Sequence, residues 1–433
     1  MKSAEEVFLT FEQKIRSGEL KAGDRLPSVR ELALQIGVDK NTVSAAYGKL
    51  KAAGLTVQHG RGGTTVRALP VFARPPSLSI PSDALDLTHG NPNPSLLPDL
   101  SDLRRVLVDE FIDAPAKLYG GMSADAEFLH WAANQFSNDD IPCRDLVVTP
   151  GALDAIDRLL AQNLNAGDKV GVEEPTYPPV LGLLSAHQLI PVPIQVDQYG
   201  LSPSGLNAAL RDGVKAVVMS TRAQNPTGAS LDADRAKELR AIAAKSKSRI
   251  LWIDDDHFSL LSQKPYHFWF REQARWAVIR SVSKFLGPDN RIAVCSGDSD
   301  TMRALSQSVT SSQRWVSHLL QRLSARLLAD PAVNRKIRQA SATYKTRTNA
   351  FVKGLAKLGF ETQFVEGLNV WIPTPQDDLL AVWLLGKGIA VRRGLEFSAA
   401  EPVHGLRITT SLMDQDTMEQ VLQALKEWKS IGW

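Results

Sequence analysis

The chain has 433 residues, 43% of them hydrophobic and 22% charged, a composition typical of a globular protein of two to four domains. It lacks an apolar run that could span a membrane, a basic and apolar leader, and the cysteines of a disulfide framework, so we expect a cytoplasmic protein with no membrane partner. The net charge is +3, but residues 1–67 alone carry +4, which a nucleic-acid partner or a solvated surface would explain equally well.

Three helices are predicted near the start of the chain. The first covers residues 5–17. Ser28, with Glu31 three residues later, forms a capping box for a short helix at 29–36, and a third helix follows at about 40–53. An apolar stripe at helical spacing faces inward from the third helix. Its members are Val43, Ala46, Tyr47 and Leu50.

The second and third helices predict a helix-turn-helix, because they are short and joined by a tight glycine turn. In this motif the later helix lies in the major groove, with its N-terminal residues at the base edges. Two strands are predicted at 55–58 and 63–67. The glycine-rich basic turn between them can contact phosphate or enter the minor groove.

This segment resembles the GntR-type winged helix-turn-helix. The matching pieces include Leu26–Ala33, Asn41–Val43 and Gln58–Gly62. The resemblance implies a DNA-binding domain over residues 1–67, with a double-stranded operator as partner. Some members of the family have an arginine where this chain has Ser44. The implied DNA contacts are Arg30, Lys40, Asn41, Thr42, Ser44, His59, Gly60 and Arg61.

Residues 68–85 carry four prolines and predict an extended linker. Beyond it, short apolar strands alternate with helical patterns, which predicts an α/β domain with a largely parallel sheet. Ligands of such sheets bind at the carboxyl ends of the strands. The predicted strands lie at 146–149, 169–172, 216–219, 250–253 and 277–279.

Lys284 follows the last of these strands, with Ser281 and Ser283 before it and Arg291 seven residues after it. A lysine amine attacks an aldehyde when burial and neighbouring cations remove its proton. Hydroxyl groups and an arginine can hold the phosphate of such an aldehyde cofactor. A surface turn rich in serine and lysine is the alternative interpretation.

Other strand ends carry residues suited to the same ligand. Ala152 opens a helix whose free N–H groups can bind phosphate, Tyr177 can stack on a ring, and Asn225 can donate to a ring oxygen. Each is also compatible with an ordinary turn or core position. The adjacent carboxylates 254–256 repel one another and need a cation, either a protonated pyridine nitrogen or a metal ion. No second cluster at ligand spacing supports the metal.

In this order the segments resemble fold type I pyridoxal-phosphate enzymes, specifically class I/II aminotransferases, over residues 86–433. The resemblance implies an α/β fold with a mostly parallel sheet and a smaller C-terminal α+β subdomain from about residue 305. It also implies pyridoxal 5′-phosphate as cofactor, joined to Lys284 as a Schiff base. Asp255 would hold the pyridine nitrogen, or Asp254 if the register differs by one.

The remaining site residues are implied by the same resemblance. Tyr177 and Asn225 would contact the ring, and Tyr119 would reach the phosphate of a neighbouring subunit. Arg407 would clamp a substrate carboxylate. His257 stands where a tyrosine is common, which alters the contact to the ring oxygen. The phosphate would be bound by Ala152, Leu153, Ser281, Ser283 and Arg291.

A GntR-type domain followed by an aminotransferase-like domain is the layout of the MocR subfamily of bacterial regulators, and the length and short linker are similar to those of its PtsJ-type members. The resemblance implies a homodimeric transcription regulator that responds to pyridoxal phosphate or to an amino compound. Two alternatives remain open. One is an active aminotransferase with a DNA-binding head and Lys284 as general base. The other is a DNA-binding protein whose body only dimerises.

Overall fold

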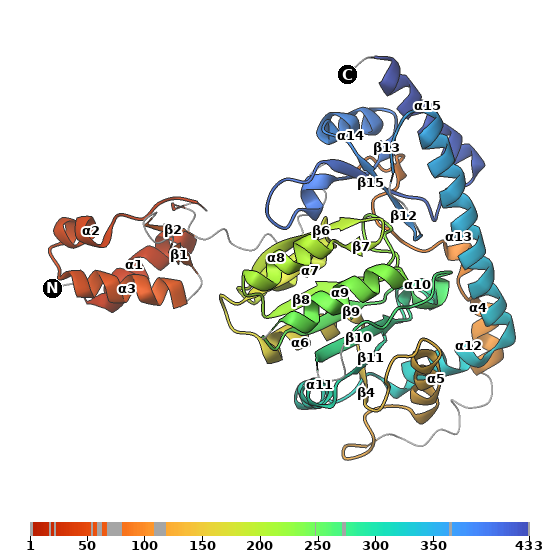
Figure 1. The fold of residues 1–433 in the computed structure, drawn as a ribbon, viewed down its shortest axis with the longest axis horizontal. Helices are drawn as coiled ribbons and strands as arrows, with labels where there is room; N and C mark the ends of the chain where they lie inside the picture. The colour runs from red at the N-terminus through yellow and green to blue at the C-terminus, as the bar shows by residue number, and fades with distance from the viewer. Residues whose placement is uncertain are drawn as a thin grey trace.

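The computed structural model describes residues 3–16, 19–20, 23–52, 55–58, 63–66, 80–107, 118–246, 248–270, 274–362 and 366–431 (Figure 1). The N-terminal part contains three helices and an antiparallel hairpin, in agreement with the sequence prediction. It buries a core of its own, which includes all four residues of the predicted stripe. Its elements are α1 (Ala4–Arg16), α2 (Val29–Ile36), α3 (Lys40–Ala52), β1 (Thr56–Gln58) and β2 (Thr64–Val66).

The predicted capping box fixes the start of α2. The hydroxyl of Ser28 accepts from the backbone of Glu31 at 3.2 Å, and the Glu31 carboxylate accepts from the backbone of Ser28 at 2.8 Å. These bonds satisfy N–H groups that have no partner within the helix. Tyr47 of α3 donates its hydroxyl to the carbonyl of Pro27 at 2.8 Å. This bond ties α3 to the segment that leads into α2.

A central sheet organises the large domain and confirms the expected α/β class (Figure 1). Five neighbouring strands from β10 to β6 run parallel, while β11 is antiparallel to both of its neighbours and β7 is antiparallel to β6. In spatial order the strands are β4 (Leu146–Thr149), β11 (Ala293–Gly297), β10 (Arg275–Ser281), β9 (Leu251–Asp255), β8 (Ala216–Met219), β5 (Lys169–Glu174), β6 (Ile190–Asp197) and β7 (Gly200–Leu201).

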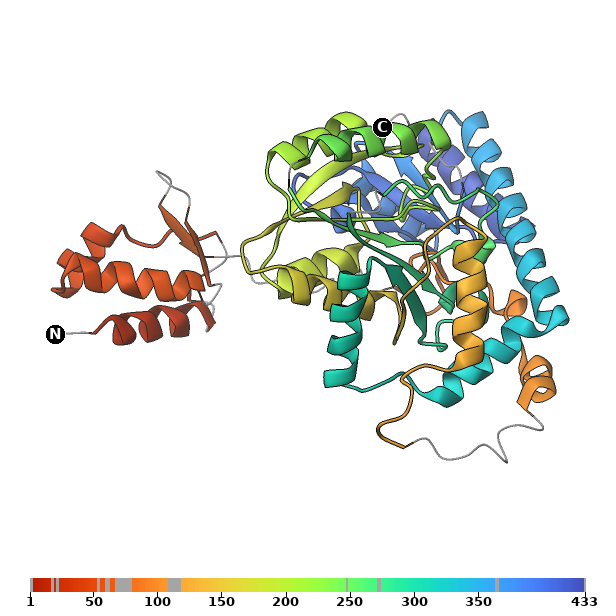
Figure 2. The ribbon, with the colours of Figure 1, turned by 60° about the horizontal axis from the view of Figure 1, so that its bottom comes forward.

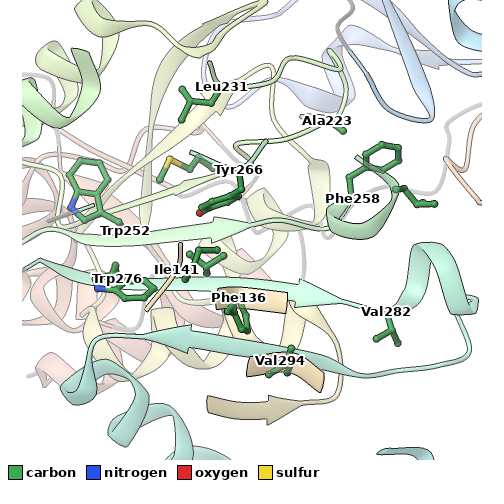
Figure 3. Packing of buried hydrophobic residues seen from close by; sticks show 14 of the residues in the cluster. Phe136, Ile141, Ala223, Leu231, Trp252, Phe258, Tyr266, Trp276, Val282 and Val294 are labelled. Atoms are coloured by element: carbon green, nitrogen blue, oxygen red, sulfur yellow. The ribbon is translucent and has the colours of Figure 1, made fainter. Parts of the chain in front are cut away.

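Helices cover both faces of this sheet. One face packs against α6 (Ala152–Asn163), α7 (Pro178–Ala186) and α11 (Ser299–Ser311). The other packs against α5 (Ala126–Ser137), α8 (Pro203–Arg211), α9 (Ala233–Lys245), α12 (His318–Ala329) and the first part of α13 (Pro331–Lys357). Figure 3 shows this second layer, in which Trp252, Trp276 and Phe136 point into the same apolar interior. Alternation along β9 therefore places Trp252 in one layer and Ile253 in the other.

A smaller α+β unit follows at the C-terminal end of the chain (Figure 2). Its three-stranded sheet has the order β12 (Asn369–Pro373), β15 (Gly405–Thr409) and β14 (Arg392–Arg393). A short pair joins β13 (Ile389–Ala390) in parallel to β3 (Leu85–Asp86). The helices of this unit are the end of α13, α14 (Asp377–Gly386) and α15 (Gln415–Ser430).

The extent of this unit differs from the expected start near residue 305. Buried side chains from Met302 to Tyr344 belong to the two layers of the large sheet, because α11, α12 and much of α13 pack there. The core of the smaller unit begins at Phe351 and also includes Leu87. The linker expected at 68–85 overlaps this unit as well, since Leu85 lies in β3.

Short elements complete the described chain. They are η2 (Pro94–Leu96), α4 (Leu100–Leu107), η3 (Ser259–Leu261), α10 (Ser283–Leu286) and η4 (Gly394–Phe397). Within the described ranges, none of the helices combines the length and the apolar character that crossing a membrane requires.

Candidate functional site

Lys284 lies in α10, directly beyond the carboxyl end of β10. The buried Val282 fixes the start of this turn by packing into the apolar layer shown in Figure 3. The Lys284 amine donates to the carbonyl of Gly90 at 2.8 Å. Burial, reinforced by the charge of Arg407 and opposed by Asp255, lowers the pKa of Lys284 to about 8. A larger fraction of this amine is therefore neutral and nucleophilic near neutral pH than for an ordinary lysine.

Asp255 ends β9 and is buried, and its Oδ1 atom has no hydrogen-bond partner among the described residues. Burial, together with Asp254 and Asp256, raises the pKa of Asp255 to about 7, whereas Lys284 opposes the rise. A buried carboxylate oxygen without a donor is costly. This atom is therefore suited to receive an N–H group from a ligand.

The neighbouring carboxylates have partners of their own. Asp254 accepts from Thr221 at 2.7 Å and from the hydroxyl of Tyr266 at 2.6 Å. These bonds assign Asp254 to the protein framework. The pyridine-binding role that the sequence left open between the two acids therefore suits Asp255, the one with an unsatisfied oxygen.

Asp256 forms the centre of a buried ion network that was not predicted. Arg222 donates two hydrogen bonds of 2.9 and 2.5 Å to its carboxylate, and Arg280 donates a third of 2.8 Å. Both arginines also pair with Asp139. Burial alone would raise the pKa of Asp256, but the two guanidinium groups hold it below its ordinary value. Within the described chain, no group of three or more His, Cys, Asp or Glu is arranged to hold a metal ion.

Asn225 and Arg407 meet across the site. Arg407, in β15, is 1% exposed and donates to the Asn225 side-chain oxygen at 3.1 Å, which leaves the Asn225 amide nitrogen as a donor. A second bond runs from Arg407 to the carbonyl of Thr88. Burial, and then the charge of Arg392, lowers the pKa of Arg407 to about 9. A carboxylate ligand would relieve this unfavourable environment.

Tyr177 and His257 lie in the same electrostatic environment. Burial raises the pKa of Tyr177. The charge of Asp255 raises it further, and the charge of Arg407 lowers it. Burial, and then the charge of Lys284, lowers the pKa of His257 to about 4, so its imidazole is neutral at physiological pH. Its Nδ1 atom lies 3.4 Å from the backbone oxygen of Asp255.

An anion cradle lies at the start of α6. Gly151 precedes this helix at a φ of 100° and has no side chain to cap it, so the first N–H groups, from Ala152 and Leu153 onward, receive no side-chain cap from it. A Cβ atom on Gly151 would lie 2.5 Å from the guanidinium of Arg291. Nearby, the hydroxyls of Ser281 and Ser283 are bonded to each other at 3.0 Å. A helix N-terminus beside an arginine provides the donors that a phosphate requires.

Tyr119 is the predicted site residue that this single chain does not bring to the others. It is 79% exposed, and its ring packs on Trp315 at 5.5 Å between centroids. Arg314 lies over the same ring at 5.1 Å. Its expected role at a neighbouring subunit's phosphate therefore needs a second chain.

The residues predicted to contact DNA that the structure describes belong to the N-terminal part. Arg30, Lys40, Asn41 and Ser44 are exposed, and Thr42 is half-buried. Asp39 caps α3 by accepting from the backbone of Asn41 at 2.8 Å. The predicted contacts His59, Gly60 and Arg61 lie outside the described residues. Arg25, which the sequence did not single out, pairs with Thr65, and its side chain lies against Gly63 at the turn end of β2.

Comparison with known proteins agrees with this architecture. The family of class I and II aminotransferases matches residues 84–425, and the gntR family of bacterial regulatory proteins matches residues 3–66. The chain is similar to the vitamin B6 salvage pathway transcriptional repressor PtsJ of Salmonella typhimurium, with 38% identity over 95% of both chains. This chain belongs to the MocR subfamily of GntR-type regulators.

Other MocR-like and aminotransferase relatives share parts of this layout. The pyridoxine biosynthesis transcriptional regulator PdxR of Corynebacterium glutamicum is 30% identical over 57% of this chain and 54% of its own. The kynurenine aminotransferase of Pyrococcus horikoshii, solved with PMP, has a TM-score of 0.72 at 23% identity, covering 80% of this chain and 92% of that one. Class I aminotransferases are pyridoxal-phosphate enzymes, so the body of this MocR protein has the fold of that cofactor family.

The titration of Lys284 gives a first prediction for this MocR body. Only the neutral amine attacks an aldehyde, so the rate of pyridoxal-phosphate capture should rise with pH through about 8 and then level off. Asp255→Asn should move this midpoint to lower pH, because the carboxylate raises the lysine pKa. Arg407→Gln should move it to higher pH. Stopped-flow absorption against pH measures all three, and a flat profile would contradict the assignment.

Proposed function

We propose that this chain is a transcription regulator whose large domain holds pyridoxal 5′-phosphate through Lys284 and alters DNA binding in response to it or to an amino compound. The observation that carries the proposal is the combination of two groups in one site. Lys284 has a lowered pKa, and it interacts electrostatically with Asp255, whose buried Oδ1 has no donor among the described residues. Domains at 1–67 and 86–433, joined through 68–85, are part of the proposal.

The residues of the site fit the cofactor one group at a time. Asp255 would accept from the ring N–H, and the Asn225 amide would donate to the ring oxygen. The start of α6 and Arg291 would bind the phosphate, and Tyr177 would lie against the ring. When bound, the cofactor supplies an electrophilic aldehyde and an electron sink.

The chemistry of Arg407 favours an effector with a carboxylate. Its guanidinium is buried, and among the described residues it forms no ion pair with an Asp or Glu. A bidentate carboxylate would provide both charge and hydrogen-bond partners. An amino acid or a related compound satisfies this requirement, since its amine can also compete with Lys284 for the aldehyde.

We further propose a homodimer through an exposed apolar surface. Leu118, Tyr119 and Met122 are 77%, 79% and 72% exposed, and Leu319 of α12 is 58% exposed. His318 joins the two segments by a 3.0 Å contact with the Met122 carbonyl. Two heads held at a fixed spacing would match paired half-sites.

The proposed dimer is tested by sedimentation at micromolar concentration. The full chain should run as a dimer, and Leu319→Asp should shift it toward monomer because burying a new carboxylate in an apolar contact is costly. Leu379→Asp, on α14, is a matched control that is 54% exposed. A monomeric wild-type protein, or equal effects of the two variants, would contradict the assignment.

The central experiment measures cofactor and DNA together. Purified protein is titrated with pyridoxal phosphate, and its absorption spectrum is recorded before and after borohydride, which should fix the cofactor to Lys284. Affinity for a duplex selected by the protein from a random library is then measured without cofactor, with it, and with added amino acids. A protein that takes up no cofactor, or whose DNA affinity never changes, would refute the proposal.

The same geometry supports aminotransferase activity as a second candidate. In its neutral form Lys284 would accept and return a proton, and Arg407 would orient a substrate carboxylate. Keto-acid formation over many cycles from an amino donor and a keto acceptor would favour it. Conversion that stops after a single equivalent would favour regulation.

A further inference from the structure

The segment Leu85–Asn91, here called the strap, leads from the linker region into the ligand site. It follows the proline-rich stretch that separates the two matched families, and its β3 residues pair with β13. The strap is therefore adjacent in sequence to the segment that leads to the DNA-binding head.

Backbone bonds anchor the strap to the smaller C-terminal unit. Leu85 donates to the carbonyl of Gly388 at 2.8 Å, and Leu87 donates to that of Ala390 at 2.9 Å. Gly90 donates to the hydroxyl of Thr409 at 3.0 Å. The hydroxyl of Ser411 in turn donates to the carbonyl of Asn91.

Two carbonyl groups of the strap also accept hydrogen bonds from the two cationic side chains of the ligand site. Gly90 accepts from the Lys284 amine at 2.8 Å, and Thr88 accepts from Nη2 of Arg407. Gly90 has a φ of 62°, and a Cβ atom there would lie 3.2 Å from the Asn369 side chain. A glycine at this point lets the backbone approach both cations closely.

Both bonds involve atoms that a ligand would use. A covalent bond to an aldehyde would be formed by the Lys284 nitrogen, the same atom that donates to the Gly90 carbonyl. Nε of Arg407 has no partner among the described residues and lies on the same edge of the guanidinium as Nη2. A carboxylate that binds this edge with both oxygens displaces the Thr88 carbonyl.

We propose that the strap is a built-in competitor of the ligand, and that its release couples the ligand site to the head. This inference rests on the proposed function, because it requires that cofactor and effector bind at Lys284 and Arg407. Ligand binding breaks the two bonds from the strap to Lys284 and Arg407. The strap then loosens, and the change reaches the linker. Coupling of this kind needs a segment whose two states differ in affinity for the ligand.

Hydrogen–deuterium exchange of the full chain tests the strap directly. Peptides covering residues 85–93 should exchange slowly in the free protein, because the backbone N–H groups of Leu85, Leu87 and Gly90 are bonded. Pyridoxal phosphate with an amino acid should raise their exchange. Unchanged or slower exchange in a protein whose absorption shows bound cofactor would overturn the strap and leave the proposed function standing. A protein without the absorption band would overturn both.

A matched pair of variants tests the coupling. Thr409→Val removes the acceptor of the Gly90 N–H, whereas Thr410→Val removes an equally buried hydroxyl that bonds to Leu368 and Thr348 instead. Both should bind the cofactor. The wild type and Thr410→Val should show a ligand-induced change in DNA affinity of about fivefold or more, and Thr409→Val less than about twofold. Equal changes in the two variants would overturn the inference.

Discussion

Lys284→Ala is expected to abolish the absorption band of the Schiff base and, with it, the ligand-induced change in DNA affinity. The amine is the group that can join the aldehyde, and its pKa of about 8 prepares it for that step. Without it, the phosphate cradle and Asp255 can hold the cofactor only by non-covalent contacts. A coupling of about fivefold or more in the dissociation constant should fall to none. Absorption spectroscopy and DNA titration on the same sample measure both effects.

Lys237→Ala provides the control for this variant. Lys237 lies on α9, is 78% exposed and pairs with Asp234 at 3.2 Å. It should keep the spectrum and the DNA response of the wild type. Thermal unfolding of both variants separates loss of the cofactor from loss of the fold. Persistence of the band in a folded Lys284→Ala protein would identify another lysine as the attachment site.

Asn41→Ala is expected to have the largest effect on DNA recognition. Asn41 is exposed at the N-terminus of α3, where a helix of this kind reaches base edges. A bidentate contact to adenine contributes about 1–3 kcal/mol, which corresponds to about 5- to 150-fold in Kd. The cofactor spectrum should not change, because Asn41 lies on α3 of the N-terminal part, which has a core of its own. Fluorescence anisotropy with a selected duplex and a one-base variant measures the loss.

Lys40 distinguishes base reading from phosphate binding on the same helix. Lys40→Ala should weaken binding to all duplexes alike and reduce the slope of log K against log salt by about 0.9. Lys49→Ala is the matched control, since Lys49 lies near the other end of α3 and pairs with Glu5. If Asn41→Ala and Lys40→Ala both leave the affinity unchanged, the reading helix has been placed wrongly.

Local sequence patterns predicted the head and several strands well. The capping box at Ser28 and the stripe along α3 involve residues three or four apart, so the chain itself displays them. Asp255 and Lys284 were also found from local patterns, because each follows a short apolar run that predicts a strand. By contrast, β6 was missed because Pro191 and Pro193 interrupt its pattern.

The tertiary part of the site could not be read from the sequence. The strap reaches Lys284 across 194 positions, and Arg222 reaches Asp256 across 34. No local spacing reports such contacts, which arise from the order of strands in the sheet. The expected start of the smaller unit near 305 was displaced for a related reason, because helical periodicity does not show which core a helix covers.

The balance of charge around Asp256 has a consequence for what the body admits. Two arginines face two aspartates there, so this cluster leaves no cation over for Asp255. A ligand with a protonated ring nitrogen would provide the donor that the ionised Asp255 Oδ1 lacks among the described residues. A carbon analogue of the cofactor, with C–H in place of the ring nitrogen, would leave the Asp255 carboxylate without a donor. We expect its binding free energy to be weaker by about 1–3 kcal/mol. We therefore expect the proposed site to prefer a heterocycle with a protonated ring nitrogen over one that has no N–H group to donate.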